Sequence, residues 1–319
     1  MALTSEGLLE IEGAQSRYVR LANGSRAHYL SWGRDGIPVL ALHGGIIGSS
    51  GAAGFRNTGT YLAERGFQVF APDMPGWGLS DLREDYWPRN GFYDHTEFLH
   101  QFVNAMCMDS FHITGNSMGC INSINYLIAH PDRVRSFAVI AGGFGDAAPI
   151  QRLNFNPADA WDGTREGMFK LMQLIINNDE HITDEVLDMR IAHATRNMEP
   201  FRAFWDAQEA VNVAKDLNLR QVNVTRGRLT EMTTPGICIY PVDDRIIPVE
   251  TGREQEDALP NVQFFYVTGA GHQAQTDRPD VVNPLLAEFF RDGKISAATA
   301  ALAGVSDRRP PLPHIVEGS

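Results

Sequence analysis

Residues 115–119 read Gly-Asn-Ser-Met-Gly, a serine set between two glycines. The run 111–114 before them is typical of a strand, and the run 118–129 after them is typical of a helix. A strand, a sharp turn and a helix around a central serine form a nucleophile elbow, which exposes the serine hydroxyl at the end of a sheet. Such a turn strains the serine backbone, and the flanking glycines remove side chains that would collide. Ser117 is therefore the candidate nucleophile.

A serine hydroxyl becomes a strong nucleophile only when a base takes its proton. His272 ends the run Gly-Ala-Gly-His directly after the last expected strand, 262–267, and is the candidate base. A carboxylate that accepts the imidazole N–H would fix the tautomer and stabilise the charged ring. Asp243 and Asp244 both follow the preceding expected strand, 236–241, and both fit this role. The chain order serine, acid, histidine is the order that such an elbow requires.

An acyl-transfer site also needs two backbone N–H groups to hold the developing oxyanion. One donor is expected from Met118, directly after the nucleophile, and the second from the loop His-Gly-Gly at 43–45. Gly45 is the expected second donor, and Gly44 beside it lets the backbone approach the substrate. The alternative for this loop is a simple tight turn. His43 itself is expected to be structural and to brace the loop.

The elements that must position these residues alternate between short apolar strands and helices. An antiparallel hairpin is expected first, from the strands 17–21 and 26–32. Buried strands are then expected at 38–42, 67–71, 134–141, 235–241 and 262–267, and helices at 94–108 and 280–290. This alternation predicts an α/β fold with a mostly parallel sheet and helices on both faces.

The alternation stops between about residues 146 and 226, where helical segments are expected at 165–177, 184–196 and 200–212, the second capped by Thr183 or Asp184. An all-helical insertion between sheet strands indicates a lid over the site; a helical subdomain with no substrate role is the alternative. The predicted organisation is a core of residues 1–145 and 227–293, a lid of 146–226, and a tail of 294–319. The tail is expected to be mobile or to reach a neighbouring subunit.

The composition sets limits on the partners. With 319 residues, 43% hydrophobic, 21% charged and a formal net charge of −12, the chain is an ordinary globular protein with a surface unsuited to nucleic acid. No apolar run reaches the roughly 20 residues of a membrane helix, and the N-terminus lacks a signal-peptide pattern. Three widely spaced cysteines indicate reduced core thiols and a cytoplasmic protein. The expected partner is a small-molecule substrate, without metal or cofactor; a homo-oligomer stays open.

Five motifs together resemble the α/β-hydrolase superfamily over about residues 17–292. They are the elbow, the His-Gly-Gly loop, Pro-Asp-Met-Pro-Gly-Trp-Gly-Leu-Ser-Asp at 72–81, Asp-Asp-Arg-Ile-Ile-Pro at 243–248, and Gly-Ala-Gly-His at 269–272. The resemblance implies the α/β-hydrolase fold, and it favours Asp244 as the acid because of the spacing to Pro248. Esterases, haloperoxidases and peptidases share these motifs, so they determine the fold better than the substrate.

The elbow and the lid run 182–190 further resemble the meta-cleavage product hydrolases, which cut a carbon–carbon bond in 2-hydroxy-6-oxo-hexa-2,4-dienoates. That resemblance implies that Arg190 binds the substrate carboxylate and that Asn116 bonds its polar end. The alternatives are an exposed Arg190 paired with a lid acid (Asp184, Glu185 or Asp188) and an Asn116 that stabilises the turn. The chain departs from the family at 46–48, Ile-Ile-Gly, and at Gln273, where tryptophan is common; both places would border the substrate.

The sequence thus predicts a serine-dependent hydrolase that cleaves a carbon–carbon bond in a product of aromatic ring cleavage. An esterase, lactonase or thioesterase with the same three residues is the alternative within the enzymes. A ligand receptor that keeps the triad without catalysis is the alternative outside them. Enzymes with an aspartate nucleophile are disfavoured because Ser117 occupies the elbow.

Overall fold

The computed structural model describes residues 3–5, 7–144, 160–213, 225, 228–229 and 232–318. Within these residues one eight-stranded sheet has the order β1-β2-β4-β3-β5-β6-β7-β8. β1 and β2 form an antiparallel hairpin, β2 is antiparallel to β4, and all other neighbours are parallel. The strands are β1 (Ala14–Arg20), β2 (Arg26–Trp32), β3 (Ile37–Leu42), β4 (Phe67–Pro72), β5 (Phe111–Asn116), β6 (Val134–Ile140), β7 (Gly236–Pro241) and β8 (Val262–Val267). The expected α/β fold with a mostly parallel sheet is confirmed.

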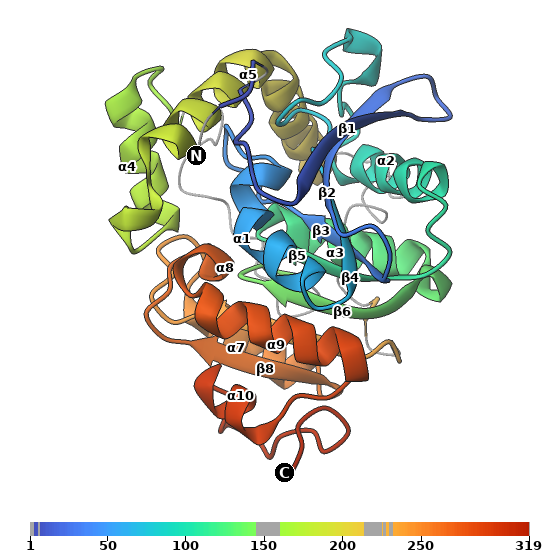
Figure 1. Ribbon diagram of the computed structural model, residues 1–319, viewed down its shortest axis with the longest axis vertical. Helices are drawn as coiled ribbons and strands as arrows, with labels where there is room; N and C mark the ends of the chain where they lie inside the picture. The colour runs from blue at the N-terminus through green and yellow to red at the C-terminus, as the bar shows by residue number, and fades with distance from the viewer. Residues whose placement is uncertain are drawn as a thin grey trace.

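Helices cover both faces of the sheet (Figure 1). Adjacent strand residues point to opposite faces, and β5 shows which helices lie on each: the Phe111 ring contacts Tyr126 of α3, whereas the His112 ring stacks on Phe290 of α9. None of the described helices is both long and apolar enough to cross a bilayer. The core helices are α1 (Gly51–Ala63), α2 (Phe92–Ala105), α3 (Met118–Ala129), α7 (Val249–Ala258), α8 (Ala274–Asp277) and α9 (Pro279–Asp292), with short turns at Glu84–Tyr86 and Pro131–Arg133.

The parallel strands place the functional loops together. The β5 and β7 side chains are buried along their whole length, as expected for strands covered on both faces. Because β3, β5, β7 and β8 are parallel, their C-terminal ends meet at one edge of the sheet. The loops that follow these strands carry the expected oxyanion residues, nucleophile, acid and base, so the fold brings four distant segments to one place.

The described part of the expected lid consists of α4 (Arg165–Ile175), a short turn at Asp179–His181, and α5 (Asp184–Val213), which lie at the upper left in Figure 1. Thr183 caps α5, since its hydroxyl accepts the Val186 N–H at 3.4 Å. The two helices expected at 184–196 and 200–212 are one helix that continues through Pro200. Residues 146–159, 214–224 and 226 of the expected lid lie outside the described residues.

The residues after Gly293 pack against the chain's own core, which corrects the expectation of a mobile tail. They include α10 (Ala297–Leu302) and run beside β8 at the bottom of Figure 1. The Gly304 carbonyl accepts the Tyr266 N–H at 2.7 Å, and the Ser306 N–H donates to the Phe264 carbonyl at 3.0 Å. β8 is an edge strand, so these bonds cover backbone groups that would otherwise be open to pairing with another chain.

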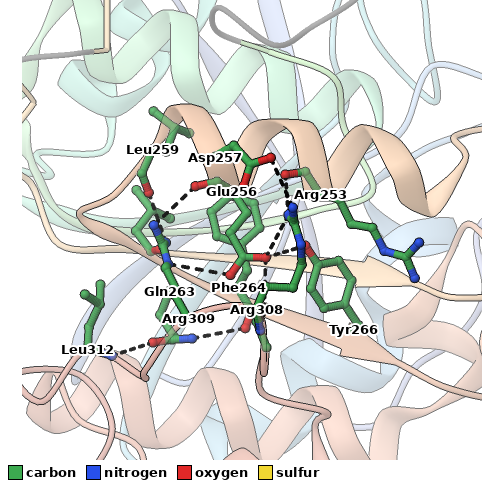
Figure 2. Close-up of polar contacts among 12 residues, drawn as sticks. Arg253, Glu256, Asp257, Leu259, Gln263, Phe264, Tyr266, Arg308, Arg309 and Leu312 are labelled. Atoms are coloured by element: carbon green, nitrogen blue, oxygen red, sulfur yellow. Dashed lines mark hydrogen bonds and ion pairs between the residues drawn. The ribbon is translucent and has the colours of Figure 1, made fainter.

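A buried carboxylate fastens this tail. Glu256 of α7 accepts hydrogen bonds from the Tyr266 hydroxyl at 2.8 Å and from the Ser306 hydroxyl at 2.9 Å. Arg308 and Arg309 of the tail lie beside it and also bind α7, as Figure 2 shows. The contact joins the tail to α7 and β8 and has no part in the functional edge of the sheet.

The cysteines match the expectation only in part. Cys120 and Cys238 are buried and free, and burial raises the pKa of both thiols well above the ordinary value. Such thiols are unreactive core residues. Cys107 is exposed, because it lies in the turn after α2, with a positive φ of 53°.

Candidate active site

The elbow has the strained geometry that its sequence predicts. Ser117 lies between β5 and α3 with φ at +57°, a region that a non-glycine residue rarely adopts. A Cβ on Gly115 would lie 2.1 Å from the Gly119 carbonyl oxygen, and one on Gly119 would lie 2.0 Å from that of Leu42. Neither position has room for a side chain, so the backbone can turn this sharply only with both glycines. Ser117 itself is half-buried.

His272 and Asp244 form a buried pair. His272 Nδ1 lies 2.8 Å from Asp244 Oδ2, and both side chains are almost fully shielded from solvent. The second oxygen, Asp244 Oδ1, accepts the N–H groups of Ile246 at 2.7 Å and Ile247 at 2.9 Å. These bonds hold the carboxylate in place, and its contact with Nδ1 leaves Nε2 of the ring free to take a proton. Asp243 instead accepts the Gly269 N–H at the surface, so the structure pairs the histidine with Asp244.

Asn116 joins the base to the nucleophile's turn. Its amide nitrogen donates to the carbonyl oxygen of His272 at 2.8 Å and to that of Ile140 at 3.3 Å. Asn116 Oδ1 is buried and has no partner among the described residues, so this oxygen is available to a ligand. No bond between the Ser117 hydroxyl and the His272 ring occurs in the described part of the chain. Such pairs often close only when substrate is bound.

The loop after β3, which carries the expected second oxyanion donor, lies against the elbow. A Cβ on Gly44 would lie 3.5 Å from Ser117 Cβ, and one on Gly45 would lie 2.9 Å from Met118 Cβ. The Met74 N–H donates to His43 Nε2 at 3.0 Å, so Nδ1 carries the proton and donates to the Gly44 carbonyl at 2.8 Å. Because a peptide unit is planar, the Gly45 N–H then points away from His43. Met118 opens α3, so its N–H has no partner within the helix.

His43 is therefore the loop's brace, as the sequence suggested. It is fully buried, and burial lowers the pKa of its ring, which keeps the imidazole neutral. The loop 72–81 is fixed beside it by Asp73, which accepts hydrogen bonds from His28 at 2.7 Å, from the Gly51 N–H at 2.8 Å and from the Leu79 N–H at 2.7 Å. The loop therefore has a structural role, and the Asp73 carboxylate makes the hydrogen bonds that hold it in place.

Arg190 is fully buried beneath the lid rather than exposed on it. Its Nη1 lies 3.4 Å from the Ser49 hydroxyl, and its backbone carbonyl lies against Gly48, so it touches the same loop that carries Gly45. Its Nε and Nη2 have no hydrogen-bond partner among the described residues. Burial, together with the charge of Arg56, lowers the pKa of Arg190 to about 9, which leaves it charged at neutral pH.

Two of the three lid acids named in the alternative are paired with another residue. Asp184 and Asp188 both pair with Arg165 of α4. Among the residues that the structure describes, none forms an ion pair with Arg190, and a buried cation without a counter-ion is costly to a protein. An anionic group of a ligand would supply one.

Sequence reasoning missed His193, which lies one turn after Arg190 on α5. It is buried, and within the described residues neither ring nitrogen has a partner. Burial lowers the pKa of His193 to about 4, so the ring is neutral and can both donate and accept. The spacing of three residues on one helix, which places side chains on the same face, was the signal that could have found it.

Gln273 is buried directly after the base. Its N–H donates to the Ile175 carbonyl of α4 at 2.9 Å, and its side-chain oxygen accepts the Thr276 hydroxyl at 3.3 Å. The side chain thus turns back on its own helix, α8. Its expected contact with substrate stays a prediction.

Comparisons with known proteins agree with the fold. A sequence model described as the alpha/beta hydrolase fold matches residues 37–279. A 2-hydroxy-6-oxononadienedioate/2-hydroxy-6-oxononatrienedioate hydrolase of Paraburkholderia phymatum is 26% identical over 287 residues, covering 88% of this chain and 96% of that protein. A solved 2-hydroxy-6-oxo-6-phenylhexa-2,4-dienoate hydrolase from Rhodococcus sp. strain RHA1 is similar with a TM-score of 0.72 at 22% identity, covering 87% and 99% of the two chains.

The same architecture is also found with another named activity. A putative lipase from Acinetobacter baumannii AYE is similar with a TM-score of 0.71 at 20% identity, covering 87% of this chain and 91% of that chain. At such identities the similarity to solved structures shows the fold alone. The match to the sequence model, in contrast, spans most of the chain. This chain belongs to the alpha/beta hydrolase fold family.

Proposed function

We propose that this protein hydrolyses a carbon–carbon bond in a 2-hydroxy-6-oxo-hexa-2,4-dienoate, the type of compound produced when an aromatic ring is opened. The single observation that carries the proposal is the buried guanidinium of Arg190 beside the loop of Gly45, two of whose nitrogens have no partner among the residues that the structure describes. A dienoate brings a carboxylate next to a 2-hydroxyl or 2-oxo group, and a planar guanidinium can bond two oxygens at once. The curated relatives named for dienedioate hydrolysis support the same substrate class.

Binding at Arg190 would prepare the substrate for cleavage. The departing fragment must carry a pair of electrons on carbon, which is too unstable unless the dienol first becomes a ketone. After that change the leaving group is a stabilised enolate. Arg190 and Asn116 Oδ1 would hold the polar end, and His272 would move the protons that ketonisation requires.

Ser117 would then attack the distal ketone while Nε2 of His272 takes its proton and Asp244 stabilises the charged ring. The N–H groups of Gly45 and Met118 would hold the oxyanion, each worth about 3 kcal/mol in a comparable site. Collapse of the intermediate breaks the carbon–carbon bond, the enolate takes a proton, and water activated by His272 releases the acid. The sum is the addition of one water molecule, so the reaction needs no oxidant, metal or organic cofactor.

An esterase, lactonase or thioesterase is the second candidate, because the proposed triad would serve equally on a C–O or C–S bond. Its supporting observation is the fold shared with the putative lipase. In such an enzyme no carboxylate has to meet Arg190.

The test compares kcat/KM of the wild-type protein for a panel of dienoates, which lose their colour on cleavage, with kcat/KM for short p-nitrophenyl esters and thioesters. We expect kcat/KM for at least one dienoate to exceed kcat/KM for every ester by about a hundredfold or more. This is the margin that two hydrogen bonds to a carboxylate provide. Ester turnover without any loss of dienoate colour would instead assign the second candidate.

A further inference from the structure

The C-terminal end of lid helix α4 is bonded to both loops of the proposed triad. The last carbonyls of a helix lack partners inside it. Here two of them are taken by residues that directly follow the acid and the base: Arg245 donates to the Gln173 carbonyl, and the Gln273 N–H donates to the Ile175 carbonyl at 2.9 Å. The lid and the catalytic loops therefore share hydrogen bonds at this junction.

Asp277 is the centre of the junction. It lies in the short helix after His272 and is 6% exposed. Its carboxylate accepts the Asn177 N–H at 3.0 and 3.1 Å and the Asn178 N–H at 3.1 Å, both from the turn after α4. Its Oδ2 also accepts the Gly271 N–H at 2.8 Å, one residue before the base.

The two segments that Asp277 joins are in close contact. A Cβ placed on Gly271 would lie only 2.9 Å from Asn177 Oδ1. A shift of the turn at 177–178 would therefore press on Gly271, the residue before His272, or pull the Gly271 N–H away from the carboxylate of Asp277. The position of the base is tied to the position of the lid.

We propose that Asp277 is a positioning residue that fixes the His272 loop to the end of α4, so that the base is aligned only while this part of the lid is in place. The proposal rests on the proposed function, because it assumes that His272 is the base. A carboxylate suits the task since its two oxygens offer about four acceptor sites. An asparagine offers only one acceptor oxygen. Its NH₂ group would face either the Gly271 N–H or the two N–H groups of the lid turn, so the hydrogen bonds on one side of the junction would be lost.

The experiment measures how fast a fluorophosphonate labels Ser117, a readout that depends on the triad and not on the dienoate. Asp277→Asn is compared with wild type at a temperature where circular dichroism shows every variant fully folded. We expect a labelling rate about ten- to a hundredfold lower, the size expected when a base is held slightly out of place. Arg245→Ala, an exposed change at the same junction, should lower the rate by a smaller factor of about two to five.

Two variants serve as matched controls. Glu256→Gln makes the same carboxylate-to-amide change in the buried tail network of Figure 2, away from the lid. Arg165→Ala releases the opposite end of α4 from Asp184 and Asp188. Both should label within about twofold of wild type if only the junction matters.

The outcomes are distinct. Slow labelling in Asp277→Asn and Arg245→Ala, with normal labelling in both controls, supports the positioning role. Equal rates in folded Asp277→Asn and wild type overturn it and leave the proposed triad untouched. Equal slowing in Glu256→Gln overturns it as well, because the effect would then be one of general stability. A wild-type protein that is never labelled refutes the serine nucleophile first and the junction with it.

Discussion

Replacing Arg190 with methionine should separate the stability of this protein from its activity on dienoates. Methionine has a similar length and no charge, so it fills the buried space under α5 without polar atoms. The wild-type guanidinium makes one hydrogen bond to a described residue, at 3.4 Å to Ser49, and is completely shielded from solvent. It therefore contributes little to holding the free protein together.

The loss of activity can be estimated from the bonds that a carboxylate would make. Two charge-assisted hydrogen bonds contribute about 1.5–3 kcal/mol each, so their removal costs about 3–6 kcal/mol. At about 1.4 kcal/mol per tenfold, kcat/KM for a dienoate should fall by a factor of about one hundred to about twenty thousand. Turnover of a neutral p-nitrophenyl ester should stay within about threefold of wild type, since Arg190 has no role in acyl transfer.

The free energy of unfolding should move the other way. An unpaired buried charge is destabilising, and replacement of buried ions by packed apolar groups is often stabilising by about 1–4 kcal/mol. Arg190→Met should therefore unfold at higher denaturant concentration than wild type, with the same slope against denaturant. The measurement is equilibrium unfolding in urea, run alongside the two kinetic assays. A variant that is less stable and loses ester and dienoate turnover in parallel would show that Arg190 is a structural residue, and the substrate assignment would fail.

Three other perturbations follow from the same structure. Gly45→Ala places a methyl group 2.9 Å from Met118 Cβ, so it should displace the expected oxyanion donor and lower kcat about a hundredfold while KM changes little; an unchanged kcat would remove Gly45 from the site. Asp73→Asn should lower the free energy of unfolding by about 3–5 kcal/mol, because it breaks the buried pair with His28. Burial alone would raise the Asp73 pKa, but His28 and its neighbours hold it well below the usual range. The stability that Asp73 contributes is therefore present above about pH 4 and lost as the pH falls further. The free energies of unfolding of wild type and Asp73→Asn should then converge in acid, and a difference that stays constant with pH would contradict the pairing. The KM for a dienoate should rise as the pH passes about 9, where free Arg190 loses its proton; a KM that is flat up to about pH 10 would exclude a charged Arg190 from binding.

The sequence predicted the parts of this protein whose signals are local. The expected elbow helix begins and ends where α3 does, and the expected strands differ from the observed ones by only a few residues. Apolar runs bounded by turn residues determine such elements with little help from distant contacts. Ser117 and its glycines belong to this class, because the turn and its steric demands involve five consecutive residues.

Tertiary contacts decided what the sequence could not. The lid helices expected at 184–196 and 200–212 left a break before Pro200, and proline removes a backbone donor and disfavours a helix interior. In the structure α5 continues past it, and the next turn packs Phe201 and Phe204 against Trp77, with ring centroids 5.4 and 5.1 Å apart. That aromatic contact comes from a loop more than a hundred residues earlier, so no local pattern reveals it.

In the functional site, too, distant contacts decide what the local sequence leaves open. Asp243 and Asp244 are adjacent and equally suited by type. The spacing to Pro248 favoured Asp244 only through the family resemblance, and the direction of the loop in the structure pairs Asp244 with His272. Asp277 bonds a turn a hundred residues away, and no pattern in the sequence singles it out. Residues that act through distant backbone groups become visible only once the fold has brought those groups together.

We propose above all that Ser117 initiates the hydrolytic cleavage of a carbon–carbon bond. The most direct measurement is product analysis by mass spectrometry after complete reaction of a single 2-hydroxy-6-oxo-dienoate with the wild-type protein and with Ser117→Ala. We expect equal amounts of a carboxylic acid and a 2-hydroxypentadienoate from wild type, and intact substrate with the variant. Intact dienoate after incubation with a wild-type preparation that hydrolyses esters, or equal product from Ser117→Ala, would contradict it.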